Sequence, residues 1–148
     1  QEGHKEIAHL LVEAGADVNC RSTDGGWAPL HVAAAKGHLD LVRFLIDRHA
    51  DVHARKDNGR EPLHIACQYG RKEIAHLLVE AGADVNCRST DGGWAPLHVA
   101  AAKGHLDLVR FLIDRHADVH ARKDNGREPL YIACQEGHKE IAHLLVEA

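Results

Sequence analysis

The fold is decided by residues 24–56, which read DGGWAPLHVAAAKGHLDLVRFLIDRHADVHARK. The next stretch, residues 57–90, reads DNGREPLHIACQYGRKEIAHLLVEAGADVNCRST and follows the same plan. The second unit is longer by a single position, which falls in a polar run, where a loop accommodates an insertion at little cost. Units of this length are typical of repeat proteins whose units stack side by side.

Outward from these two units, the whole chain repeats as copies of the pair. Residues 1–67 recur as 68–134, and residues 135–148 repeat residues 1–14 without a change. The first copy differs from the second at three positions, which are Glu2 to Tyr69, His4 to Arg71 and His64 to Tyr131. Copies this similar indicate either a recent tandem duplication or an engineered array.

Each unit predicts a tight turn and two helices. Asp-Gly-Gly or Asp-Asn-Gly supplies the left-handed positions of the turn. A proline then opens a short helix, expected over 29–36 and 62–69, and a glycine ends it. The second helix is expected over about 38–48 and 71–81, with apolar residues along one face.

The apolar face of the second helix needs a neighbouring layer to cover it. In the first full unit this face consists of Leu41, Val42, Leu45 and Ile46. A lone pair of helices cannot bury it, but stacked pairs can. We therefore expect Leu45 and its copy Leu112 to be buried between layers.

Composition excludes several classes of function. The 148 residues carry 18 basic and 22 acidic side chains, a formal net charge of −4, which argues against binding to nucleic acid or an anionic membrane. No apolar run approaches the ~20 residues of a membrane span. The four cysteines are repeat copies without a C-x-x-C spacing, which favours packing roles in a reducing, cytoplasmic environment.

The strings APLHVAA (28–34), GHLDLV (37–42) and GADVN (82–86) resemble the ankyrin repeat, and the resemblance covers essentially the whole chain. It implies an all-α fold, a solenoid of stacked helix-turn-helix units joined by turn or hairpin fingers, with a concave binding side. We expect one outer helix over 4–14 and then four inner–outer pairs, nine helices in all. The single domain, 1–148, would divide into a partial repeat 1–23, full repeats 24–56, 57–90 and 91–123, and a partial repeat 124–148.

The chain departs from the family pattern before each proline. The usual threonine is replaced by Ala28, Glu61, Ala95 or Glu128. This change predicts the loss of a helix-capping hydroxyl and of its bond to the following histidine. In the last unit the histidine itself is replaced by Tyr131.

No catalytic, cofactor or metal motif is present. The phosphate-binding loop, the nucleophile elbow and the His-Glu-x-x-His zinc motif are all missing, so we predict a protein that is not an enzyme and has no cofactor. The closest ligand cluster is His49, Asp51 and His53, repeated at His116, Asp118 and His120. Because Asp51 occupies a structural turn position of the family and no fourth ligand is visible, we predict no metal site.

By resemblance, a partner would bind at the turn tips and at the far ends of the inner helices. The residues at these positions are Asp24, Trp27 and Lys36; Asp57, Asn58, Arg60, Gln68 and Tyr69; Asp91, Trp94 and Lys103; and Asp124, Asn125, Arg127 and Glu136. Trp27 and Trp94 are the strongest candidates, since Trp, Tyr and Arg are the usual interface anchors. The alternative is that each indole only covers its own turn and the neighbouring finger.

These observations leave two functions open. The first is a scaffold that binds a protein partner on the concave face, and the second is an engineered array built for stability or self-assembly. Neither terminal unit has a polar outer face, which predicts weak end-to-end self-association.

A modification is the last expectation from the sequence. Asn19 and Asn86 lie in Asp-Val-Asn, which looks like the context used by an asparaginyl hydroxylase in ankyrin repeats. The alternative, which we favour, is an asparagine that satisfies backbone groups of a turn.

Overall fold

The computed structural model describes residues 2–148, with side chains from His4 onward. This part of the chain contains nine helices, as predicted. They are α1 (Glu2–Glu13), α2 (Pro29–Lys36), α3 (Leu39–Asp47), α4 (Pro62–Gln68), α5 (Lys72–Glu80), α6 (Pro96–Lys103), α7 (Leu106–Asp114), α8 (Pro129–Gln135) and α9 (Lys139–Glu147). None of the helices in residues 2–148 has the length and apolar character to cross a membrane.

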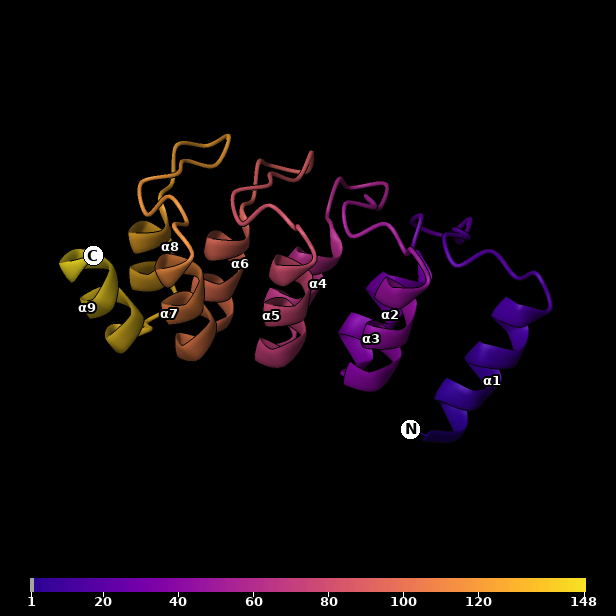
Figure 1. Ribbon diagram of the computed structural model, residues 1–148. Coiled ribbons are helices and arrows are strands. Elements are labelled where there is room, and N and C mark those ends of the chain that lie inside the picture. The colour runs from indigo at the N-terminus through magenta and orange to yellow at the C-terminus, as the bar shows by residue number, and fades with distance from the viewer. Residues whose placement is uncertain (1) are drawn as a thin grey trace.

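The helices form five layers in a row (Figure 1). The inner helices α2, α4, α6 and α8 contact one another in that order, and so do the outer helices α1, α3, α5, α7 and α9. α1 is the outer helix of a layer that has no inner helix in this chain. The connections between layers project to one edge of the row, and we call them fingers.

The fingers are turns tied by backbone hydrogen bonds rather than strands. The amide of Ser22 donates to the carbonyl of Trp27 (2.9 Å), and the amide of Lys56 donates to the carbonyl of Arg60 (3.0 Å). Successive fingers are joined as well, because the amide of Asp57 donates to the carbonyl of Gly25 (2.9 Å). Gly26 must be glycine here, since its φ is +71° and a Cβ would lie 2.5 Å from a carboxylate oxygen of Asp57.

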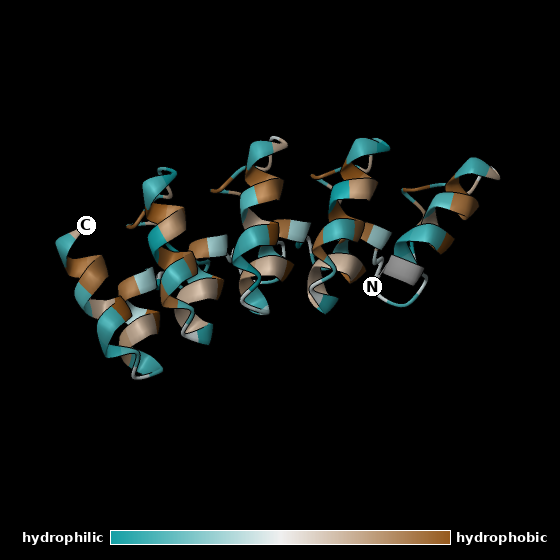
Figure 2. Ribbon diagram, turned by 60° about the horizontal axis from the view of Figure 1, so that its bottom comes forward, coloured by the Kyte–Doolittle hydropathy of each residue, from teal (hydrophilic) through white to brown (hydrophobic). Residues whose placement is uncertain are grey.

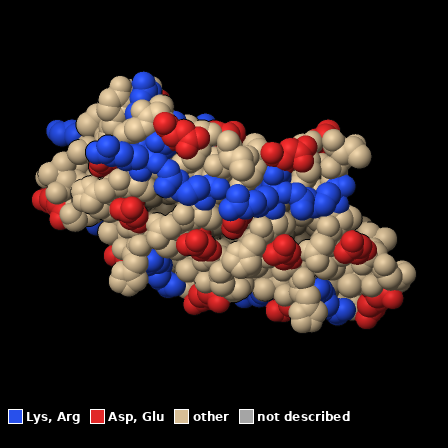
Figure 3. Space-filling view, turned by 90° about the horizontal axis from the view of Figure 1, so that it is seen from above, with Lys and Arg blue, Asp and Glu red and all other residues tan. Residues whose placement is uncertain are grey.

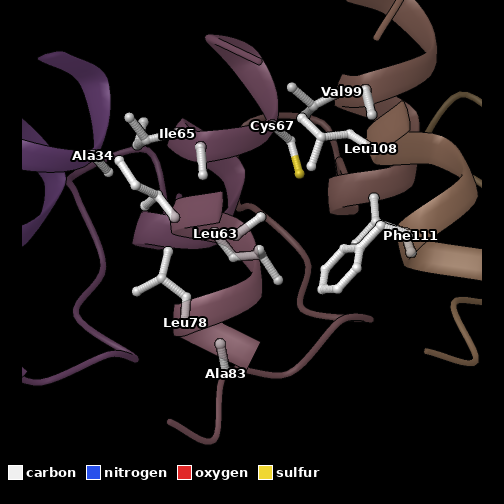
Figure 4. Packing of buried hydrophobic residues seen from close by; sticks show 14 of the residues in the cluster. Ala34, Leu63, Ile65, Cys67, Leu78, Ala83, Val99, Leu108 and Phe111 are labelled. Atoms are coloured by element: carbon white, nitrogen blue, oxygen red, sulfur yellow. The ribbon is translucent and has the colours of Figure 1, made fainter. Parts of the chain in front are cut away.

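The core lies between the layers, where apolar faces of neighbouring helices meet (Figures 2 and 4). Leu45 and Leu112 are 4% and 0% exposed, which confirms the expected burial. Leu41 and Ile46 are only half-buried, whereas Phe44, which the predicted stripe omitted, is buried. Phe44 is buried because His9 of the preceding layer packs against its ring at 5.4 Å between centroids.

A buried histidine near the start of the inner helices α2, α4 and α6 links one layer to the next. The amide of Ala28 donates to Nδ1 of His31 (3.0 Å), and Nε2 of His31 donates to the carbonyl of Arg60 in the next finger (3.1 Å). The capping hydroxyl and its bond to histidine are both absent, as expected, and the histidine accepts the backbone amide instead. His64 makes the same two bonds, with the amide of Glu61 and the carbonyl of Trp94. His98 accepts the amide of Ala95 but donates to the carbonyl of Ala121, which precedes Arg127, the copy of Arg60.

The bonding pattern requires that these histidines be neutral. Nδ1 accepts a backbone amide, so a proton on Nδ1 would break that bond. Burial, and secondarily nearby cationic side chains, lowers the pKa of each of His31, His64 and His98 to about 4. The histidines are therefore structural bases, and their neutral form belongs to the folded state.

The last layer departs from this arrangement. Tyr131, at the histidine position, is 52% exposed, and its ring lies under the Arg127 guanidinium. Cys67 is fully buried as a small packing residue, as predicted, but its copy Cys134 is exposed, so the prediction for Cys134 is wrong. The reason is that the side of α8 that carries Cys134 has no further layer against it in this chain. All four cysteines are free.

Candidate protein-binding face

The predicted binding residues lie on the fingers and at the ends of the inner helices, but they differ in exposure. The four finger aspartates, Lys36, Lys103, Tyr69, Asn125 and Glu136 are exposed, whereas Trp27, Trp94, Arg60, Arg127, Gln68 and Asn58 are half-buried. The half-buried members are the ones that can hold a partner side chain against a fixed surface, because their positions are already set by packing.

Five of these residues come together around one hollow of about 250 Å³. It is lined by Arg60, Gln68, Trp94, Lys103 and Glu136, with Val99 and Ala102. The lining belongs to three consecutive units, so only stacking creates the hollow. It is smaller than the roughly 300–1,000 Å³ of small-molecule pockets, and its size fits a single side chain.

Trp94 is held by cations on its ring. The Nζ atom of Lys123 lies 3.7 Å from the ring centroid, and the guanidinium carbon of Arg60 lies 5.5 Å from it. His98 meets the ring edge-on at 6.4 Å between centroids. Trp27 has the same setting, with Lys56 at 4.0 Å and His31 at 6.1 Å. These contacts support the structural interpretation of both indoles, and each indole is still only half-buried.

The lysines on the indoles carry an electrostatic cost. Burial lowers the pKa of Lys123, and the charges of Arg127 and Arg60 lower it further. Lys56 has its pKa lowered by burial and then by Arg60. Like charges are therefore gathered here at close range, partly balanced by Asp57, Asp91 and Asp124.

Arg60 is the most constrained cation of the hollow. Its side chain is 17% exposed, and Nε lies 3.5 Å from Oδ2 of Asp91 in an ion pair. The same Nε is buried and has no hydrogen-bond partner. The Nε atom thus faces Asp91, and the Nη groups are the donors through which this guanidinium could bind an incoming carboxylate.

Two predicted binding residues instead hold turns. The Oδ1 atom of Asn58 accepts the amide of Arg60, and that of Asn125 accepts the amide of Arg127, both at 3.1 Å. Each asparagine thus fixes the backbone that carries an arginine. Their contribution to binding would be to position that arginine.

The set around Trp27 is less complete than the set around Trp94. Lys36 is the copy of Lys103, but this sequence contains no counterpart of Arg60 ahead of Trp27, and the counterpart of Gln68 is Gln1, which lies outside the described residues. Sequence reasoning treated the two sets as equal. It also missed Val99 and Lys123, whose roles depend on contacts between units rather than on a position within one unit.

Asn19 and Asn86 bridge neighbouring fingers. The Oδ1 atom of Asn86 accepts the amide of Asp118 (2.8 Å), and its Nδ2 donates to the carbonyl of His116 (3.4 Å). Asn19 makes the same bonds to Asp51 and His49. These bonds support the turn-stabilising interpretation, and hydroxylation of the two asparagines stays a prediction.

The histidine-rich turns also have a backbone role. His49 and His116 adopt φ values of 69° and 70°, the left-handed conformation that Gly15 and Gly82 supply in the other units. Asp51 accepts the amide of His53 (2.9 Å), as a turn aspartate does. Among residues 2–148 no group of three or more His, Cys, Asp or Glu side chains is placed to hold a metal ion.

Comparison with known proteins gives a family match and several relatives. A family model described as "Ankyrin repeats (3 copies)" matches residues 1–89 and 82–148. Protein phosphatase 1 regulatory subunit 27 of Homo sapiens is 44% identical over 57 residues, which are 38% of this chain and 36% of the relative. 2-5A-dependent ribonuclease of Mus musculus is 42% identical over 59 residues, 40% of this chain and 8% of the relative.

A third relative is Notch-regulated ankyrin repeat-containing protein B of Danio rerio, which is 47% identical over 47 residues, 32% of this chain and 41% of the relative. The chain thus spans well under half the length of each of these relatives. Stacked helix pairs, the repeated sequence strings and a family match across the full length agree. The chain belongs to the ankyrin repeat family.

Proposed function

We propose that this chain is a non-enzymatic scaffold that binds a protein partner on the face formed by the fingers and the inner-helix ends, with the hollow at Trp94 as the anchor. The observation that carries this proposal is the composition of the hollow. It joins an aromatic ring, the apolar residues Val99 and Ala102, the cations Arg60 and Lys103, and the carboxylate of Glu136 around about 250 Å³. Interface anchors of this kind carry most of the energy of a protein complex.

The relatives are compatible with a binding role, since the one named as an enzyme, the ribonuclease, is matched over only 8% of its length. One of them is a regulatory subunit of a phosphatase. Ankyrin repeats generally mediate contacts between proteins, and the four free cysteines suit a reducing, cytoplasmic environment. The comparisons give no support to a designed origin, the alternative that the near-identical copies leave open.

Selection from a displayed library of random peptides tests the proposal. The bait is the full chain, and the selected peptides are then measured against Ala102→Gln, which places a larger neutral side chain in the hollow. The matched control is Ala35→Gln at the copy of Ala102 beside Trp27. We expect peptides that lose at least about tenfold in affinity for Ala102→Gln and little for Ala35→Gln. Peptides that bind all three proteins equally, or no peptides at all, would contradict the proposal.

A second candidate is end-to-end association of two copies, which one comparison within the chain favours. Ile7 and Leu11 of α1 are 57% and 56% exposed, whereas the identical Ile141 and Leu145 of α9 are 2% and 7% exposed. The same apolar face is thus exposed on α1, which has no inner helix beside it, and buried on α9, where the inner helix α8 covers it. Sedimentation equilibrium over a range of concentrations tests this candidate, and a monomer throughout would exclude it.

A further inference from the structure

A continuous band of basic side chains runs along the fingers, although the chain as a whole is acidic. Figure 3 shows this band crossing the molecule from end to end, with acidic side chains along both of its margins. The sequence conceals it, because basic and acidic residues alternate within each finger and only stacking aligns them. A net charge of −4 therefore coexists with one strongly basic line.

We define the basic ridge as six finger residues, Arg21, Lys56, Arg60, Arg88, Lys123 and Arg127. Their charges interact along the row. Arg60 affects Lys56 on one side and Lys123 on the other, Arg127 affects Lys123, and Arg88 and Lys123 both act on His98. Arg88 also donates through Nη2 to the carbonyl of Arg122 in the following finger.

Two further finger arginines, Arg55 and Arg122, are left out of the ridge because each pairs with a glutamate. Arg55 pairs with the buried Glu61 (3.5 Å), and Arg122 pairs with Glu128 (3.5 Å). Arg60 also pairs, with Asp91 (3.5 Å), and is kept because it lines the hollow. By contrast, Lys56 and Lys123 rest on indole rings and are repelled by neighbouring arginines. An anion on the ridge would relieve that repulsion, and the ridge is therefore the part of the surface with most to gain from one.

We propose that the ridge binds an acidic, extended segment of a partner protein, whose carboxylates follow the ridge while one apolar side chain enters the hollow at Trp94. This inference rests on the proposed function in taking the partner to be a protein. Arg60 serves both parts, since it belongs to the ridge and lines the hollow. Its Nε is buried against Asp91, so its Nη groups are the donors left for a carboxylate.

The geometry favours a peptide over a nucleic acid. Single-stranded nucleic acid binds by stacking its bases on aromatic rings, but Lys123 and Lys56 already lie over the two indoles. Duplex nucleic acid presents charge over a broad front, and the acidic margins of the ridge would repel it. A single extended peptide is narrow enough to stay between those margins.

The test measures binding of two labelled probes by fluorescence anisotropy. The probes are poly-L-glutamate of about 20 residues and mixed-sequence single-stranded DNA of about 20 nucleotides. Each is titrated with the unchanged chain, with Lys56→Glu/Lys123→Glu, and with the control Arg43→Glu/Arg110→Glu. The control makes the same change of charge at exposed positions of the outer helices α3 and α7. Circular dichroism checks that both variants are folded.

We expect poly-L-glutamate to bind the unchanged chain, to bind less tightly as salt is raised, and to lose at least about tenfold in affinity in the ridge variant. The control should stay within about twofold. Equal losses in both variants, no binding of poly-L-glutamate, or tighter ridge-dependent binding of DNA would overturn the inference. If the displayed peptides depend on the hollow but lack Asp and Glu, the ridge proposal fails while the proposed function stands.

Discussion

Mild acid should unfold this protein through its three buried histidines. His31, His64 and His98 are 0% exposed, and each has its pKa lowered from 6.5 to about 4. The unfolded chain binds protons at these sites near pH 6.5, whereas the folded chain binds them only near pH 4. Stability is therefore complete above pH 6.5 and is lost as the pH falls from 6.5 towards 4.

The magnitude follows from the size of the shift. A pKa difference of about 2.5 units corresponds to about 3 kcal/mol for each histidine. With all three sites, the free energy of unfolding should fall by up to about 4 kcal/mol per pH unit in the steepest part of this range, and by about 9 kcal/mol in total. Domains have only about 5–15 kcal/mol of stability, so most of it should be lost by pH 4.

Glu61 has the opposite effect on how stability depends on pH. It is 4% exposed, and burial raises its pKa, with the charges of Arg55 and His53 opposing the rise. Protonation of Glu61 on acidification therefore favours the folded state. This one group offsets only part of the loss from three histidines.

Urea unfolding followed by circular dichroism at several pH values between about 7.5 and 5 measures the slope. His98→Gln should lower stability at about pH 7.5 and reduce the pH dependence by about one third, because one of three proton sites is gone. The control is His143→Gln, whose side chain is 74% exposed, and it should leave the slope unchanged. A free energy of unfolding that stays constant across this range, or a slope that is the same in His98→Gln as in the unchanged chain, would refute the reasoning.

Three further predictions test other parts of the fold by urea unfolding. Leu45→Ala should lower the free energy of unfolding by about 2–5 kcal/mol because it leaves a cavity between layers. The control Arg43→Ala, at an exposed position, should change it by less than about 0.5 kcal/mol, and equal losses would show that the helix face is assigned wrongly. Gly59→Ala should lower the free energy of unfolding clearly more than Gly126→Ala. Both glycines have a positive φ, but only at Gly59 would a Cβ meet a backbone atom, the Thr90 nitrogen at 2.5 Å. Equal losses would contradict that contact. Asn86→Ala should lower the free energy of unfolding by about 1 kcal/mol, because it removes the two hydrogen bonds to the following finger. An unchanged free energy would contradict the turn-stabilising interpretation.

The helices, their layers and most of the core could be predicted from the sequence because they depend on local signals. Proline starts, glycine ends and the apolar stripe all lie within one unit. Phe44 escaped this reasoning because a side chain of the preceding layer, His9, buries it. The prediction that Cys134 is buried failed for the converse reason, because burial at its position requires a following layer.

The site was predictable only as a set of positions. That Arg60, Trp94 and Lys103 share a hollow depends on how far each unit is offset from the next, which no single unit encodes. The basic ridge was hidden for the same reason, because net charge adds residues without regard to their place in space. The histidines were considered only as partners of a capping hydroxyl in their own unit, whereas one of the two bonds of each crosses to the next finger.

The alternation of two unit types also bears on how such a chain can grow. Where a unit that carries Arg60 is followed by a unit that carries tryptophan, as at Trp94, the junction forms a hollow. At the reverse junction the unit that carries Trp27 precedes the unit that carries Arg60. Copying one unit alone would create a junction of like with like, for which the side chains are not matched. Copying the two units together within this chain repeats only the two junction types that it already contains. The pair is thus the smallest segment that recombination can insert without new packing, and each insertion adds one further anchor for a partner.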